Sequence, residues 1–121
     1  MDTRSKIVNA DAAPRAATVV TGTFDVMRAD DARELSAIRG RTPARPLVVV
    51  ILPLPGAPLP ERARAELAAA LRVVDYVLVT DDGHPDALLA ALEPAELVRL
   101  EAVHADRMRQ LKEHVHRRQT R

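Results

Sequence analysis

The chain has 121 residues, which is enough for one domain with a core of its own and short for two. It has no cysteine, which excludes disulfides and cysteine-ligated zinc, and its net charge of +1 argues against a dedicated electrostatic binder of nucleic acids. No apolar run approaches the roughly 18 residues that cross a bilayer, so we expect no membrane segment and a cytoplasmic location.

Residues 1–15 are polar with scattered charges, show no periodicity and end in Ala-Ala-Pro-Arg. They lack the hydrophobic core of a signal peptide. We expect a flexible leader over residues 1–15, one folded domain over residues 16–118 and a tail over residues 119–121.

Four runs rich in branched apolar residues predict β-strands, and four stretches with apolar residues at helical spacing predict helices. In chain order we expect strands at 17–21, 46–52, 75–80 and 96–100, alternating with helices at 30–39, 60–71, 85–92 and 102–118. Strict alternation of strand and helix favours a parallel sheet with right-handed crossovers. The sequence therefore predicts a single-domain, Rossmann-like α/β fold with helices on both faces of the sheet.

The loop after the first strand is the main candidate for a ligand site. Gly22 lets the chain turn with its amide groups unhindered, and these amides together with the next helix terminus can receive an anion such as a phosphate. An ordinary turn is the alternative, with Phe24 packed beneath the loop and Asp25 bonded to backbone amides. The residues of the loop alone leave both interpretations open.

Three longer stretches resemble one protein family. VVTGTFDVMRADDARELSAIR, LPERARAELAAALRVVDYVLV and ALEPAELVRLEA are similar to segments of the cytidylyltransferase-like nucleotidyltransferases. This family includes glycerol-phosphate cytidylyltransferases and the adenylyltransferase domain of heptose-phosphate enzymes. The resemblance covers roughly residues 16–117 and implies the nucleotidyltransferase fold. It also implies these nucleotide-binding candidates: Thr21, Gly22, Thr23, Phe24, Asp25 and Arg28.

The chain departs from the family pattern where the chemistry takes place. The two histidines and the intervening glycine of the family motif fall at Arg28, Asp30 and Asp31. In the family the histidines donate to the triphosphate and stabilise the charge that develops during transfer. An ionised Asp31 cannot donate, and a carboxylate about 4 Å from a phosphate charge costs on the order of 4 kcal/mol. The later Ser/Thr-rich phosphate motif of the family also has no counterpart.

Two further sets of residues are candidates for chemistry. Asp25, Asp30 and Asp31 can gather a Mg²⁺ ion, or Asp30 or Asp31 can instead cap the helix. His84 follows two aspartates after the third strand and is a candidate acid or base, as Arg28 is a candidate phosphate contact. The string around His84 also fits a turn before a helix.

The last helix carries basic and apolar residues. Arg107 and Lys112 belong to a basic set that fits either a solvated helix face or a surface for nucleic acid or an acidic partner. Met108 and Val115 belong to an apolar side that we expect to pack on the sheet or on a second subunit. We expect His104 and the other histidines of this helix to be structural or surface residues.

The function expected from the resemblance is that of a non-catalytic or weakly active relative. It binds a nucleotide or phosphate ligand, such as ATP or CTP with Mg²⁺, or serves as a regulatory or scaffold subunit. One alternative is an active adenylyl- or cytidylyltransferase that acts on a sugar or polyol phosphate. Another is an adaptor that uses its basic last helix. Family members are commonly dimers, so the resemblance implies a homodimer.

Overall fold

The computed structural model describes residues 3–24, 29–56, 59–80 and 85–119. Strands and helices alternate along the chain, as the sequence predicts. The elements are β1 (Thr18–Gly22), α1 (Ala29–Arg41), β2 (Leu47–Ile51), α2 (Glu61–Ala69), β3 (Tyr76–Val79), α3 (Pro85–Leu92), β4 (Glu96–Arg99) and α4 (Glu101–Gln119). Two short 3-10 helices, η1 (Thr3–Lys6) and η2 (Ala10–Ala12), precede them.

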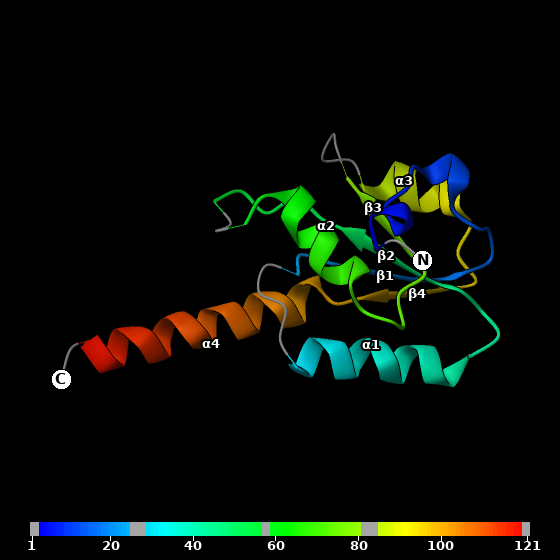
Figure 1. The fold of residues 1–121 in the computed structure, drawn as a ribbon. Helices are drawn as coiled ribbons and strands as arrows, with labels where there is room; N and C mark the ends of the chain where they lie inside the picture. The colour runs from blue at the N-terminus through cyan, green and yellow to red at the C-terminus, as the bar shows by residue number, and fades with distance from the viewer. Residues whose placement is uncertain (1–2, 25–28, 57–58, 81–84, 120–121) are drawn as a thin grey trace.

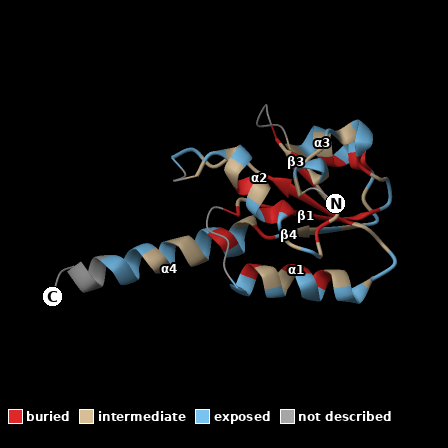
Figure 2. Cartoon of the chain, in the orientation of Figure 1, coloured by how far each residue is buried: buried red, intermediate tan, exposed pale blue. Residues whose placement is uncertain are grey.

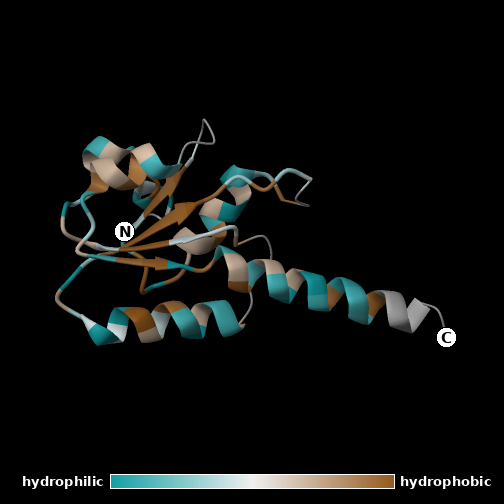
Figure 3. Cartoon of the chain, turned by 180° about the vertical axis from the view of Figure 1, so that it is seen from behind, coloured by the Kyte–Doolittle hydropathy of each residue, from teal (hydrophilic) through white to brown (hydrophobic). Residues whose placement is uncertain are grey.

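The four strands form one parallel sheet in the order β3-β2-β1-β4. Val20 of β1 lies opposite Val49 of β2 on one side and Val98 of β4 on the other. All residues of β1 and β2 are buried, because these two strands lie in the middle of the sheet with both faces covered (Figure 2). Figure 3 shows the strands of the sheet mostly in the brown of hydrophobic residues.

Helices cover both faces of the sheet, which confirms the predicted fold (Figure 1). Side chains of α1 and α2, such as Leu35 and Ala68, pack with Val20 and Val49 on one face. On the other face, Leu89 of α3 belongs to a separate cluster. This cluster includes the strand residues that alternate with those of the first face. Successive strand residues point to opposite faces, so a continuous apolar strand supplies both clusters.

The N-terminal residues, expected to be a flexible leader outside the domain, pack on the domain instead. Ile7 forms a parallel bridge with Val77 of β3, and the Val8 amide donates to the Val77 carbonyl at 3.0 Å. Ile7 also contacts the α1–α2 core, and Ala13 is buried on the α3 face. The segment thereby covers the outer edge of β3, which otherwise presents unpaired backbone groups to solvent. A short edge contact of this kind leaves no periodic signal in the sequence.

The helix α4 begins at the sheet and then extends away from the body of the molecule (Figure 1). Val103 and Val115 are 37% and 45% exposed. The expected packing of the apolar side of this helix on the sheet therefore does not extend to these two residues. Within the described part of the chain, no helix is both long enough and apolar enough to cross a membrane.

The docking of the N-terminal segment predicts that Ile7→Ala lowers the free energy of unfolding by about 1–2 kcal/mol. This loss is smaller than that for truncating a fully buried aliphatic side chain, because Ile7 is only partly buried. Urea unfolding measures the change. Asn9→Ala is the matched control, because Asn9 is exposed and its side chain forms no capping bond to η2. Equal stabilities of the two variants would contradict the docking.

Candidate functional site

The loop that leaves β1 is the segment for which the sequence predicts a nucleotide site. Thr21 and Gly22 end β1, and Thr23 and Phe24 follow. Phe24 is 1% exposed and has a φ of 47°, so the chain turns sharply with this ring packed inside. Three predicted site residues lie outside the described part of the chain: Asp25, Arg28 and His84.

His104 of α4 fills the space next to Gly22. Its imidazole is 8% exposed and meets the Phe24 ring edge-on, with 4.5 Å between the ring centroids. A Cβ atom on Gly22 would lie 2.5 Å from His104 Cε1, 2.7 Å from His104 Nδ1 and 2.8 Å from Phe24 Cε2, and real Cβ atoms do not make contacts this short. The missing side chain of Gly22 therefore makes room for two rings of the chain itself, the His104 imidazole and the Phe24 ring. The sequence suggests a different reason, the close approach of a phosphate.

A second side chain of α4 occupies the end of β1. The Thr21 hydroxyl donates to Glu101, at 2.7 Å from Oε1 and 3.0 Å from Oε2. Glu101 begins α4 directly after β4, so its carboxylate lies at the carboxyl ends of two neighbouring strands, β1 and β4. Crossover helices change from one sheet face to the other at this pair of strands, where open α/β sheets usually bind ligands. In this chain, side chains of α4 take up that position.

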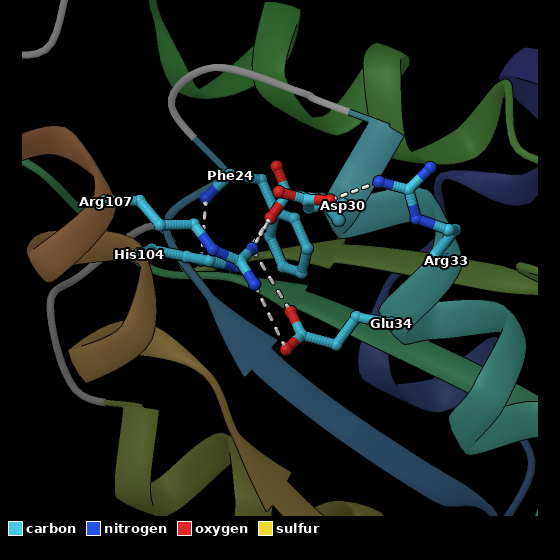
Figure 4. A network of polar contacts seen from close by, with 7 residues as sticks. Phe24, Asp30, Arg33, Glu34, His104 and Arg107 are labelled. Carbon is cyan, nitrogen blue, oxygen red and sulfur yellow. Dashed lines mark hydrogen bonds and ion pairs between the residues drawn. The ribbon is translucent and has the colours of Figure 1, made fainter. Parts of the chain in front are cut away.

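Asp31 is buried in an ion-pair cluster between α1 and α4. Figure 4 shows Glu34 and Arg107 of this cluster. Asp31 is 3% exposed and pairs with Arg107, whose Nη1 also lies 3.3 Å from Glu34 Oε1. A buried carboxylate needs such a partner, because desolvation of an unpaired charge is very costly. The sequence suggests that Asp31 repels a phosphate as a free carboxylate, whereas in the structure its charge is compensated internally.

Asp30 lies on the outer side of α1, away from this cluster. It pairs with Arg33 three residues further along the helix, and both side chains are exposed (Figure 4). Asp30 and Asp31 thus have separate arginine partners and do not converge as two ligands of one Mg²⁺ ion. The third member of the predicted Mg²⁺ set, Asp25, lies outside the described residues.

Asp31, Glu34 and His104 place potential ligand atoms within 4.8 Å of one another. The hydrogen bonds of the imidazole argue against a metal centre. His104 Nδ1 accepts the Phe24 amide hydrogen at 3.4 Å, so the neutral ring carries its proton on Nε2, which faces Asp31 Oδ1 at 3.5 Å. A metal ion needs the free lone pair of that nitrogen, and the guanidinium of Arg107 already supplies a positive charge. The cluster fits an internal ion-pair network.

Burial lowers the pKa of the His104 imidazole below its ordinary value of 6.5, because desolvation penalises the charged form. Asp31 and Glu34 act in the opposite direction, and Arg107 adds to the lowering. The imidazole is therefore neutral at pH 7, in agreement with its role as an acceptor for the Phe24 amide.

Arg64 is a buried residue of this region that the sequence interpretation missed. It is 1% exposed, and its Nη1 donates to the carbonyl oxygens of Thr23 at 2.6 Å and Leu52 at 2.9 Å. These bonds hold together the chain segments that leave β1 and β2. The available signal was its position on α2, next to Ala65 and one turn before Ala68, on the face that packs on the sheet.

The side chains at the end of β1 join the sheet to α4. Thr21 donates to Glu101, and Arg107 faces two carboxylates. No known family model matches the chain, and a comparison with curated proteins finds no match either. The resemblance to nucleotidyltransferases therefore remains an inference from the motif residues.

The contact of Gly22 with His104 predicts that Gly22→Ala lowers the free energy of unfolding by about 1–3 kcal/mol, as overpacking of a core usually does. Urea unfolding measures the loss. The same substitution in a His104→Ala background should cost less, because the two closest clashes are then removed and only the one with Phe24 Cε2 at 2.8 Å remains. An unchanged cost in that background would show that His104 is not what Gly22 accommodates.

Gly40→Ala is the matched control for this substitution. Gly40 lies in α1, and a Cβ atom built on it meets nothing within 4 Å. Because alanine favours helix over glycine, we expect Gly40→Ala to leave stability unchanged or to raise it by about 0.5–1 kcal/mol.

The lowered pKa of His104 predicts an acid-sensitive fold. The unfolded chain binds the imidazole proton more tightly, so the contribution of His104 to stability is complete above about pH 6.5 and declines as the pH falls towards the folded pKa. Unfolding free energies between about pH 7.5 and pH 5.5 should fall less steeply in His104→Gln than in the wild type. His114→Gln is the control, since His114 is exposed on the same helix. Parallel pH profiles for wild type and His104→Gln would contradict a neutral buried imidazole.

Proposed function

We propose that the chain is a nucleotidyltransferase-like protein that does not transfer nucleotides and acts as a regulatory or scaffold subunit. Its parallel α/β sheet and the glycine loop after β1 support a relation to that family. Of the two roles expected from the resemblance, nucleotide binding and scaffolding, the packing of α4 favours the second.

The observation that carries the proposal is the occupation of the end of β1 by α4. His104 lies against Gly22 where a phosphate would approach the loop, and the Glu101 carboxylate is bonded to Thr21 nearby. A bound triphosphate would have to displace the imidazole and approach this carboxylate. Both demands oppose binding, the first by sterics and the second by charge.

The chemistry of the residues also opposes transfer. Nucleotidyl transfer depends on donors that stand ready before the reaction to stabilise charge on the phosphate oxygens. Asp31 replaces one family histidine and is paired with Arg107, and Asp30 replaces the glycine of the motif. These substitutions remove a donor and add side chains, so loss of turnover is the expected consequence.

A scaffold role needs a free surface, and the outer half of α4 offers one. Met108 and Leu111 are partly exposed and Val115 is 45% exposed, with spacings of three and four residues along the helix. This spacing sets their side chains on one stripe. The homodimer implied by the resemblance is one partner that fits this stripe, and we include it in the proposal.

The proposal predicts that ATP and CTP, with and without Mg²⁺, neither release pyrophosphate in the presence of sugar and polyol phosphates nor shift the melting temperature. A ligand at a hundred times its Kd adds about 2.7 kcal/mol of stability, which for a domain of this size shifts melting by roughly 10 °C. Absence of any shift at millimolar nucleotide therefore excludes tight binding. Melting curves and a pyrophosphate assay are the measurements.

Pyrophosphate release that is lost in Arg28→Ala would overturn the proposal in favour of an active transferase. Arg72→Ala is the control for that outcome. Arg72 is exposed and follows α2 in the chain, far in sequence from the loop after β1. A melting shift without turnover would support nucleotide binding in place of the scaffold role.

A further inference from the structure

The strand β4 forms one edge of the sheet, and its outer side has no neighbouring strand among the described residues (Figure 1). The opposite edge, at β3, is covered by the N-terminal segment through the bridge of Ile7 with Val77. An open edge presents unpaired N–H and C=O groups that can pair with another chain, so native proteins usually cover, charge or interrupt it. Of the two edges, β4 is therefore the one that can accept a strand from a partner.

The backbone groups of Leu97 and Arg99 point away from the sheet. The amides of Glu96 and Leu100 donate inward, to carbonyl oxygens of the chain at β1. Backbone groups of alternate residues point to the same side of a strand, so Leu97 and Arg99, at the positions in between, direct their N–H and C=O groups outward. No described backbone group is bonded to them. Two donors and two acceptors are thus available along the outer side of β4.

The side chain of Leu97 is exposed in the middle of this open edge. Leu97 lies opposite Val19 of β1, which belongs to the core cluster that includes Leu89 of α3. Leu97 itself is 36% exposed, so α3 does not cover the sheet as far as β4. An apolar side chain at the centre of an open edge strand favours pairing with another strand.

The outward groups of β4 match those of a second copy of the same strand. In an antiparallel pair with a two-fold axis at Val98, Leu97 lies opposite the partner's Arg99 and exchanges two N–H···O bonds with it. By symmetry Arg99 does the same with the partner's Leu97, so every outward group of both strands is bonded. An axis at Leu97 instead places Arg99 opposite the partner's Ala95, whose amide already donates to Ala17.

The side chains are compatible with this register. Residues directly opposite each other point to the same face, so each exposed Leu97 lies beside the aliphatic stem of the partner's Arg99. No charged residue of β4 lies directly opposite its own copy, because Glu96 faces the partner's Leu100. Glu96 is also paired with two arginines of its own chain.

The helix that follows β4 leaves this edge open. Glu101 and His104, in the first turn of α4, contact Thr21 and Gly22 at the end of β1. The helix therefore begins by turning towards the middle of the sheet, away from the outer side of β4.

We propose that the open edge of β4 pairs with the same edge of a second copy, as an antiparallel contact that joins two four-stranded sheets into one. The inference rests on the homodimer of the proposed function, assigns a surface to it and leaves the stripe on α4 for another partner. Contact between two short strands lies at or below the low end of specific interfaces, about 1,200 Å². We therefore expect a dimer that forms at high concentration and dissociates on dilution.

Sedimentation velocity over a range of concentrations measures the dimer. We expect the wild type to shift from the mass of one chain to that of two, and Leu97→Lys to stay monomeric, because lysine protects an edge against pairing. Leu67→Lys is the matched control, since Leu67 is 39% exposed on α2, and it should dimerise as the wild type does. A monomeric wild type, or a dimer that persists in Leu97→Lys, would overturn the proposal.

Arg99→Pro is a second variant that leaves the inward bonds of β4 intact, because proline is tolerated where the N–H faces out from an edge strand. It removes one outward donor and should also be monomeric, with a melting curve that shows a folded chain. Leu111→Lys, on the apolar stripe of α4, should still dimerise. Loss of the dimer in Leu111→Lys and not in Arg99→Pro would assign the contact to α4 and contradict this inference.

Amide hydrogen exchange tests the register directly. Exchange of the Leu97 and Arg99 amides should slow by about tenfold when nine-tenths of the chains are dimeric, because only the free monomer then exchanges. The Val98 amide points inward and should not respond to concentration. Leu97 and Arg99 amides that ignore concentration while a dimer forms would rule out β4 as the interface. Nucleotide turnover would overturn the proposed function and leave these measurements unaffected.

Discussion

The packing of His104 against Gly22 joins parts of the chain that are far apart in sequence. The missing side chain of Gly22 admits the imidazole, and the ring in turn accepts the Phe24 amide as the chain leaves β1. On the same helix, Glu101 accepts from the Thr21 hydroxyl and Arg107 pairs with Asp31. The space beside Gly22, where the sequence suggests a phosphate, therefore holds an imidazole of the protein's own helix α4.

The charged groups between α1 and α4 are paired with one another in the same region. Asp31 is buried as a charged group, and Arg107 of α4 compensates its charge. The same guanidinium also pairs with Glu34. His104 remains neutral among these groups because burial outweighs the attraction of the two carboxylates for a proton. Asp31 and Glu34 of α1 are therefore joined to α4 through Arg107.

At the carboxyl edge of the sheet, the surroundings of β1 and β4 differ from those of the outer strand β3. At β1 and β4, side chains of α4 fill the usual ligand position. At β3, the N-terminal segment pairs through Ile7 and lines a pocket together with residues of β3 and α3. An edge strand permits this, because only one of its sides is occupied by a neighbouring strand.

The sequence by itself determined the alternation of strands and helices and hence the parallel sheet, because apolar periodicity is a local property of the chain. It also marked the segment around Gly22 as either an anion site or an ordinary turn, since glycine permits both. Only the tertiary structure decided what approaches it, which is His104, 82 residues later in the chain. The partners of Asp31 and the docking of Ile7 were likewise decided in three dimensions. Contacts between distant residues depend on where the helices pack, and no local pattern records that.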